Sequence, residues 1–133
     1  MQSEKFVVVE VQGVKYRVVT QSKIRKHLST ILLNEWGIEE FNVEWHSKMN
    51  GWDWTVEILK VSDIKLWTNV MEDSNFLLNL EERVEIQKDR ILQNQSIEPI
   101  VVRGRDMVLY DGYARFHSLK RLGKHKVLAY VGT

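Results

Sequence analysis

The stretch that decides the fold is Asp111-Gly112-Tyr113-Ala114-Arg115-Phe116-His117-Ser118-Leu119-Lys120-Arg121-Leu122-Gly123, which predicts a strand end, a turn and a helix. Gly112 lets the backbone turn sharply and lets a ligand approach without a Cβ in the way. The amide hydrogens of the first helical turn have no partner inside the helix, and the helix dipole favours an anion beside them. Arg115, within that turn, carries a forked donor suited to phosphate oxygens. The pattern indicates an anion site, although many such junctions bind nothing, and Asp111 then only caps the helix.

The segments on either side of this stretch predict further regular structure. Pro99 to Val102 is a short apolar strand entered through proline, whose missing amide hydrogen suits the first residue of a strand. Met107 to Tyr110 predicts a second strand, and Val127 to Val131 predicts a last one. Upstream, Asn79 followed by Glu82 is a capping-box pattern, which predicts that a helix begins there.

The first 60 residues predict two β-hairpins around one helix. Phe6 to Val11 and Val14 to Thr20 are rich in β-branched residues and meet at Gln12-Gly13, a two-residue hairpin signal. Ser22 to Trp36 has apolar residues at helical spacing, and a glycine follows that is well placed to end the helix. On the apolar stripe of this helix only Glu35 is polar.

Alternating aromatic and apolar residues around Asn50-Gly51 predict the second hairpin, because both turn residues tolerate a positive φ. Trp45 lies on one predicted strand and Trp52 and Trp54 on the other, so the three rings are expected on one face. Large aromatic residues usually build a core or a dimer interface, and a homodimer through this hairpin is one predicted interaction. Stacking on single-stranded bases is the alternative, which the neighbouring carboxylates disfavour.

Length and composition predict a soluble α+β unit with a small mixed sheet and packed helices. The chain has 133 residues, 44% hydrophobic and 28% charged, which excludes disorder, collagen and coiled coil. Residues 1–60 are expected to form a β-α-β extension packed on the same unit as residues 61–133. The absence of cysteine excludes disulfides, thiolate metal sites and a cysteine nucleophile. No apolar run is long enough to span a membrane, so a cytoplasmic location is expected.

Charge is divided unevenly along the chain. Residues 1–99 carry 12 Lys and Arg against 16 Asp and Glu, whereas residues 100–133 carry 7 against 2. A basic end on a near-neutral protein favours a local anion site, although solvated surface charge explains the count equally well. The candidate nucleic-acid contacts are Lys23, Arg25, Lys26, Lys120 and Arg121.

Residues 61–131 resemble the ParB/sulfiredoxin superfamily. The shared layout is a helix, a proline-led apolar strand, a turn, a second strand, the Asp-Gly-x-x-Arg helix start at Asp111 and a closing glycine; this variant is similar to that of free-serine kinases. Members bind CTP, ATP or ADP with the phosphates at the start of this helix. The resemblance therefore implies that Gly112, Tyr113, Ala114 and Arg115 hold phosphate, with His117 facing the same side. It also implies a nucleoside di- or triphosphate with Mg²⁺ as the cofactor.

Departures from the superfamily narrow the function that the resemblance implies. Sulfiredoxins need a cysteine where this chain has Tyr113, so sulfinic-acid reduction is excluded. Partition proteins carry a second arginine at the position of Ala114, so CTP-gated clamping is not expected. Kinase-type members use a loop glutamate as general base, and Glu72 and Asp73 occupy that loop here. With Asp111 they are the candidate catalytic or Mg²⁺-holding acids, the alternative being exposed loop acids beside a helix start.

Two functional hypotheses follow from these observations. The first is a stand-alone ParB-like domain that binds a nucleotide at the segment from Gly112 to Arg115, with phosphoryl transfer or nuclease-like phosphodiester chemistry as its reaction. The second is a non-catalytic, DNA-associated accessory module of a partition or mobile-element system. A pure oligomerisation element built on the tryptophans is a third and weaker hypothesis.

Overall fold

The computed structural model describes residues 6–67 and 74–133, and all structural statements concern these residues. The strands are β1 (Phe6–Val11), β2 (Val14–Val19), β3 (Trp54–Lys60), β4 (Lys65–Leu66), β5 (Ile100–Arg103), β6 (Val108–Asp111) and β7 (Lys126–Gly132). The α-helices are α1 (Ile24–Trp36), α2 (Ile38–Phe41), α4 (Ser74–Leu92) and α5 (Tyr113–Arg121). Four short helical turns complete the order: η1 (Gln21–Lys23), η2 (Asn42–His46), η3 (Met49–Gly51) and η4 (Val61–Asp63). None of the described helices is long and apolar enough to cross a membrane.

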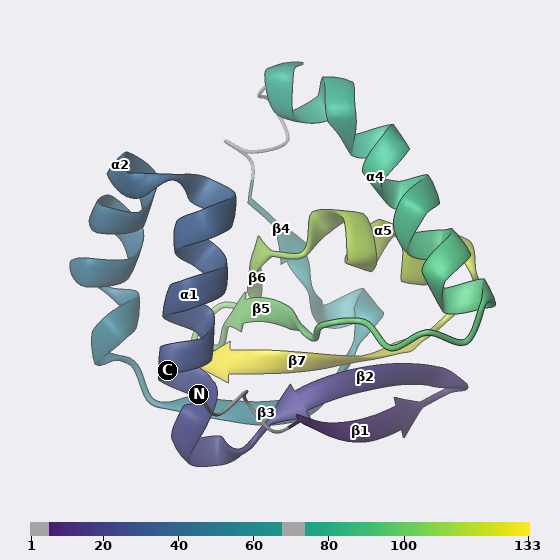
Figure 1. Cartoon of the computed structure of the whole chain (residues 1–133), viewed down its shortest axis with the longest axis horizontal. Coiled ribbons are helices and arrows are strands. Elements are labelled where there is room, and N and C mark those ends of the chain that lie inside the picture. The colour runs from purple at the N-terminus through teal and green to yellow at the C-terminus, as the bar shows by residue number, and fades with distance from the viewer. Residues whose placement is uncertain (1–5, 68–73) are drawn as a thin grey trace, which may run out of the picture.

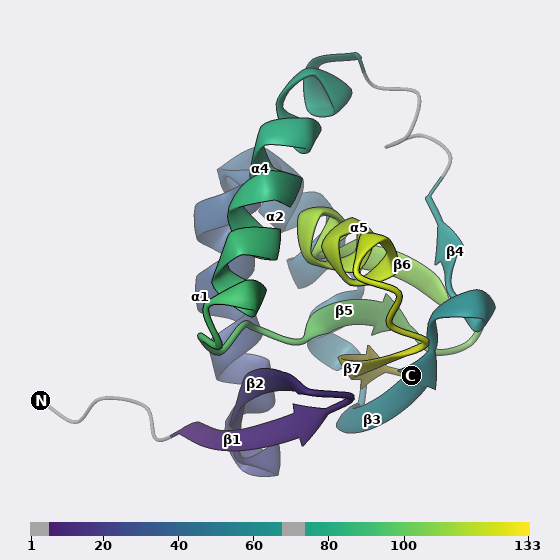
Figure 2. The same cartoon turned by 90° about the vertical axis from the view of Figure 1, so that its right-hand side faces the viewer.

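A five-stranded mixed sheet lies at the centre of the molecule (Figure 1). Its strand order is β3-β7-β5-β6-β4. The β3/β7 and β5/β6 pairs are antiparallel, and the β7/β5 and β6/β4 pairs are parallel. Helices α4 and α5 lie together on one side of this sheet, and the β1–β2 hairpin lies on the other (Figures 1 and 2). The predicted α+β class with a small mixed sheet is confirmed.

Several local predictions are confirmed. The β1–β2 hairpin turns at Gln12 and Gly13, whose φ values of 49° and 80° are those that a tight hairpin turn requires. Helix α1 ends at Trp36 with Gly37 as its cap, and the strands around the Asp111 turn form as expected.

Helix α4 begins at Ser74, five residues before Asn79, so the predicted start at the capping-box pattern was wrong. The carbonyl of Asn79 instead accepts a bond from Arg83 Nε within the helix.

The predicted second hairpin is absent from these described residues, because residues 38–46 and 49–51 are helical. Phe41 and Trp45 stack with ring centroids 6.0 Å apart, as residues four apart on a helix do. Trp45 stacks in turn on Trp54, and both are buried at 2% and 4% exposure. The tryptophans that were expected to support a dimer therefore pack inside this chain, with Trp52 half-buried beside them.

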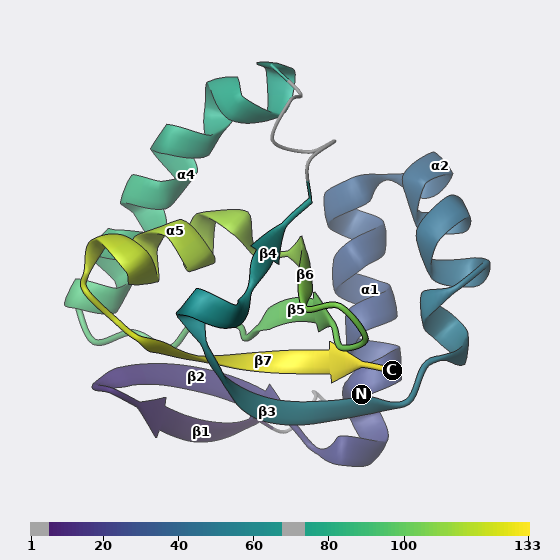
Figure 3. The same ribbon diagram turned by 180° about the vertical axis from the view of Figure 1, so that it is seen from behind.

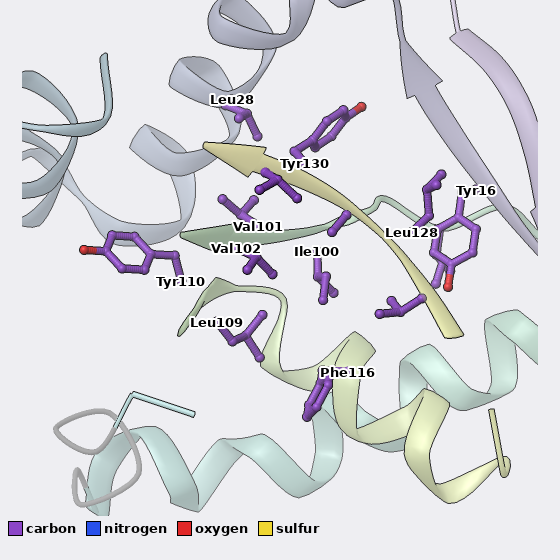
Figure 4. Packing of buried hydrophobic residues seen from close by; sticks show 14 of the residues in the cluster. Tyr16, Leu28, Ile100, Val101, Val102, Leu109, Tyr110, Phe116, Leu128 and Tyr130 are labelled. Carbon is purple, nitrogen blue, oxygen red and sulfur yellow. The ribbon is translucent and has the colours of Figure 1, made fainter. Parts of the chain in front are cut away.

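The core lies between the sheet and its flanking elements (Figure 4). Leu109 of β6, Ile100 of β5 and Phe116 of α5 meet on one face of the sheet. Tyr130 and Val101 point to the other face, toward Leu28 of α1. The following side chains have no measurable exposure: Tyr16, Ile24, Leu32, Ile100, Leu109, Leu119, Val127 and Tyr130.

The first 60 residues contact the rest of the chain through backbone hydrogen bonds. Strand β3 pairs with β7 over its whole length, from Trp54 opposite Gly132 to Lys60 opposite Lys126 (Figure 3). On the hairpin side, Arg17 N donates to the Ile97 carbonyl at 2.9 Å, and Ile97 N donates to the Lys15 carbonyl at 2.9 Å. These contacts hold α1 beside the start of α5, where the candidate site lies (Figure 1).

Candidate phosphate-binding cleft at the start of α5

The turn from β6 into α5 passes through Gly112, which has left-handed backbone angles of φ 98° and ψ 30°. Residues with a Cβ avoid this region. A Cβ at this position would lie 2.8 Å from an Arg115 guanidinium nitrogen and 2.9 Å from the Ile100 Cγ2 methyl. The turn therefore depends on glycine for its backbone angles and for the close approach of Arg115.

The side chain of Arg115 folds back over this turn. Its Nη2 lies 3.3 Å from Asp111 Oδ2, and the two side chains are only 12% and 10% exposed. The Nε atom of Arg115 is buried and has no hydrogen-bond partner among the described residues. The ion pair with Asp111 thus leaves a charge-assisted donor unused beside the helix start.

The beginning of α5 opens onto a cleft of about 800 Å³. Its lining comes from α1, α2, α4, the residue after β4 and the segment from the end of β6 into α5. Five charged residues line it: Glu35, Glu40, Asp111, Arg83 and Arg115. Trp36 and Trp67 add aromatic surface, so the cleft offers charged groups next to apolar walls, as ligand sites commonly do.

Gly112 is the N-cap residue of α5, and it offers no capping side chain. Within the described residues, Asp111 bonds Arg115 rather than the first-turn amides, so the simple capping role considered for this aspartate is not seen. Ala114 also lines the cleft, and its small side chain leaves the helix start open. The start of α5 and the Arg115 side chain therefore border the same cleft.

The Tyr113 side chain has a structural role. Its hydroxyl donates to the Leu109 carbonyl at 2.8 Å and accepts from the Trp67 amide at 2.9 Å. Burial raises the pKa of this phenol, so it stays neutral at physiological pH. Any contact of Tyr113 with phosphate has to come from its backbone.

His117 lies one turn further along α5 and does not line the cleft formed by the described residues. Its ring contacts Tyr113 and Phe116. Burial, and then the nearby Lys120 and Arg121 charges, lower its pKa, which favours the neutral ring. The structure thus separates His117 from the other predicted phosphate-binding residues.

Glu35, like Glu40 and Arg83, is a charged residue of this cleft that the sequence analysis did not assign to a site. It lies near the end of α1 and forms a hydrogen bond with the Asp111 carboxyl group. Desolvation within the cleft, then this hydrogen bond and the Asp111 charge, raise the pKa of Glu35 to about 8. A protonated Glu35 therefore donates to the Asp111 carboxylate near neutral pH. The available signal was its place as the one polar residue on the apolar stripe of the helix.

The other predicted acids, Glu72 and Asp73, lie outside the described residues. Among the residues that the structure does describe, no group of three or more His, Cys, Asp or Glu side chains is arranged to hold a metal. Among the described residues, the acids that line the cleft and could bind a divalent cation are Glu35, Glu40 and Asp111.

The predicted nucleic-acid contacts fall at separate places on the molecule (Figures 1 and 2). Lys23, Arg25 and Lys26 lie at the start of α1, where Arg25 donates to the Trp52 carbonyl at 2.9 Å. Arg121, at the end of α5, forms two hydrogen bonds with the Glu81 carboxylate, at 2.5 and 2.8 Å. Lys120 extends over the Phe116 ring. The five residues do not form one surface.

The raised pKa of Glu35 predicts that stability depends on pH. The folded state binds a proton that the unfolded state has lost, so the free energy of unfolding falls as pH rises from about 4.5 to about 8. Because Glu35 is more than one third exposed, solvent screening reduces the effect to about 1 kcal/mol, or roughly 4 °C in Tm. Thermal melts from pH 5 to 8.5 should show a smaller decline for Glu35→Gln than for the wild type. Parallel curves for the two proteins would contradict the assignment.

Around the cleft the elements follow the order α4-β5-β6-α5-β7, with a glycine and an arginine at the start of α5. Neither the models of protein families nor the curated proteins contain a match. Several solved structures are similar to the chain, and two of them are named here. One is "Structure of the C2221 form of Pnob8-like ParB-N domain", with 25% identity and a TM-score of 0.47 over 61% of this chain and 30% of that one. The other is "Structure of the pNOB8-like ParB N-domain", with 27% identity and a TM-score of 0.44 over 63% and 30%.

In both cases the matched region is less than one third of the other chain. At TM-scores below 0.5, these similarities assign no activity to this chain.

Proposed function

We propose that this chain is a ParB-like domain that binds the phosphate groups of a nucleotide in the cleft at the start of α5. The observation that carries the proposal is the Arg115 guanidinium, held at a left-handed glycine with a buried donor that no described residue uses. A phosphate in the cleft would bond to the Arg115 guanidinium and to the first-turn amides of the helix. The volume of about 800 Å³ lies within the range of small-molecule sites.

Charge in the cleft sets a condition on the ligand. With every group ionised, three carboxylates face two guanidinium groups, which disfavours a bare polyphosphate. Protonation of Glu35 removes one negative charge. A magnesium ion would reverse the balance further, because Mg²⁺ binds through one or two carboxylates together with substrate phosphates and water. Asp111 would supply one of those carboxylates, and the ion would neutralise phosphate charge.

The same carboxyl pair suits phosphoryl transfer. A general base works best with a pKa near the operating pH, and Glu35 meets this condition. Deprotonated Glu35 would take the proton of an attacking hydroxyl or water. The oxygen of that hydroxyl or water would form the new bond to phosphorus. The bond from phosphorus to the leaving oxygen would break in the same step. Glu35 would then be the general base, the role for which the sequence analysis considered Glu72 and Asp73.

Isothermal titration with ATP, CTP and ADP in the presence of Mg²⁺ tests the proposal. The wild type should bind at least one of them, and ligand at about 100 times Kd should stabilise the fold by roughly 2.7 kcal/mol. Arg115→Lys keeps the charge but loses the fork, so we expect affinity to fall at least about tenfold. Assays for released phosphate on the same samples measure turnover.

The matched control is Arg105→Lys, the same exchange at an exposed arginine in the β5–β6 turn. It should leave nucleotide affinity unchanged. If the wild type shows neither heat nor a thermal shift with any of the three nucleotides, the proposed function is wrong.

A further inference from the structure

A second cleft, of about 610 Å³, lies at the other end of α5. It is bounded by η4, the carboxyl end of α5 and the connection into β7. Its floor is apolar, with Val61, Ile64, Leu66 and Phe116. Its other lining residues are Ser62, Lys60, Lys120, Lys124, His125 and Lys126. We call this second cleft the lysine groove. No acidic residue is among the described residues that line it.

The lysines of this groove have no anionic partner in the described chain. None of the four forms an ion pair with a described carboxylate. Lys60 and Lys126 are direct partners across the antiparallel β3–β7 pair. Like charges at such positions repel, so the fold keeps an unfavourable pair here. By contrast, the neighbouring Arg121 is neutralised by Glu81.

The fold also holds this cationic segment in place. Gln12, in the β1–β2 turn, accepts bonds through its side-chain oxygen from the His125 amide at 2.9 Å and the Lys126 amide at 3.0 Å. The Gln12 backbone carbonyl accepts a bond from Lys124 Nζ at 2.9 Å. Val61 N donates to the His125 carbonyl at 2.9 Å, which fixes η4 against the same loop. A site that is held in advance loses less entropy when a ligand binds.

The ammonium of Lys120 completes the rim. It lies 5.6 Å from the centroid of the Phe116 ring, within the range of a cation–π contact. The result is four cations around a partly apolar floor, and three of them lie in residues 100–133, which carry the excess of basic residues. Several closely spaced cations match a ligand with several closely spaced anions.

We infer that the lysine groove binds the phosphodiester backbone of single-stranded nucleic acid. Lysine ammonium groups bind phosphates as point charges, and release of counterions supplies the affinity. The half-buried Val61 and Leu66 leave apolar surface that an unpaired base can contact. In a duplex the bases lie inside the stack and are not available for this contact. The inference is independent of the nucleotide cleft, because the two sets of lining residues have no member in common.

Fluorescence anisotropy with a labelled single strand of about 20 nucleotides tests this inference, since single-strand sites span about 4–16 nucleotides per fold. Binding to the wild type should weaken steeply as monovalent salt rises. Each phosphate contact contributes about 0.7 to the logarithmic salt slope, so Lys60→Gln with Lys126→Gln should lower that slope by about 1.4. The same relation predicts that affinity falls roughly 25-fold at about 0.1 M salt.

The matched control is Lys23→Gln with Lys26→Gln, which removes the same charge from the start of α1. It should lower affinity no more than about threefold. Melting curves check the fold, and the groove variant should be at least as stable as the wild type because one repulsive pair is removed. In the wild type, bound oligonucleotide should protect Lys60 and Lys126 from chemical acetylation.

Four results would overturn the inference. The first is no binding by the wild type at low salt. The second is an equal loss of affinity in the two double variants. The third is acetylation of Lys60 and Lys126 at the same rate with and without bound oligonucleotide. The fourth is full displacement of the strand by an equal nucleotide concentration of free nucleoside monophosphate or by a duplex of the same sequence.

Discussion

Gly112→Ala is expected to lower the free energy of unfolding by about 2–3 kcal/mol and Tm by roughly 10 °C. The alanine would have to adopt a φ near 98°, and its Cβ would overlap the Arg115 guanidinium and the Ile100 methyl. Relief of that overlap moves Arg115 away from the start of the helix, so nucleotide binding should be lost as well. Thermal or urea unfolding measures the first effect, and titration calorimetry measures the second.

Gly123→Ala separates backbone strain from overlap. Gly123 also has a positive φ, 75°, but a Cβ there would meet nothing within 4 Å. We expect this variant to lose only about 1 kcal/mol, the ordinary cost of a left-handed alanine. Equal losses at the two glycines would show that the close approach of Arg115 has no energetic importance.

Arg115→Ala is expected to have the second large effect, a loss of about 3 kcal/mol in unfolding free energy. It leaves the Asp111 carboxylate buried without its cation, and removal of one partner costs more than the pair contributes. Urea unfolding at neutral pH measures this change in the free energy of unfolding. The slope of the free energy against urea concentration shows whether the surface exposed on unfolding has also changed.

A double-mutant cycle with Asp111→Asn tests the cause of this loss. When Asp111 is already neutral, removal of Arg115 should cost at least about 1 kcal/mol less than it does in the wild type. The Arg105→Ala variant, at an exposed position, should change stability by less than about 0.5 kcal/mol. Additive losses from Arg115→Ala and Asp111→Asn would mean that their ion pair is not coupled in the folded state.

The carboxyl-terminal part of the fold could be predicted from the sequence, because its local signals agree with one another. The apolar runs before and after Gly112, the glycine itself and the closing Gly123 favour the same order of strands and helix that the structure has. The position of Arg115 in the first turn was enough to place its guanidinium near the cap.

The segment from Phe41 to Trp54 shows why the second hairpin was mispredicted. Phe41 and Trp45 are four residues apart, a spacing that fits both alternation on a strand and one face of a helix. Val43 would share their buried face on a strand, but in the structure it is 57% exposed, as its place on the helix requires. The Asn50-Gly51 pair, taken as a hairpin turn, lies in the 3-10 turn η3.

The partner of Asp111 could not be found by sequence alone. Glu35 lies 76 positions earlier on a different helix, and only the packing of α1 against the sheet brings the two carboxyl groups together. A polar residue on the apolar stripe of a helix indicates that a polar group of another element contacts it. The pattern does not identify that group. The lysine groove was hidden in the same way, because Lys60 joins the later lysines only through β3–β7 pairing.

The place of β7 in the sheet has a consequence for how the protein is made. Residues 126–132 form an inner strand with β3 on one side and β5 on the other, so the sheet cannot close before they have left the ribosome. Until then, β3 and β5 each have an edge that is not paired with β7. Such distant pairing slows folding and exposes strand edges. The sheet of the nascent chain is therefore expected to stay open until these residues emerge.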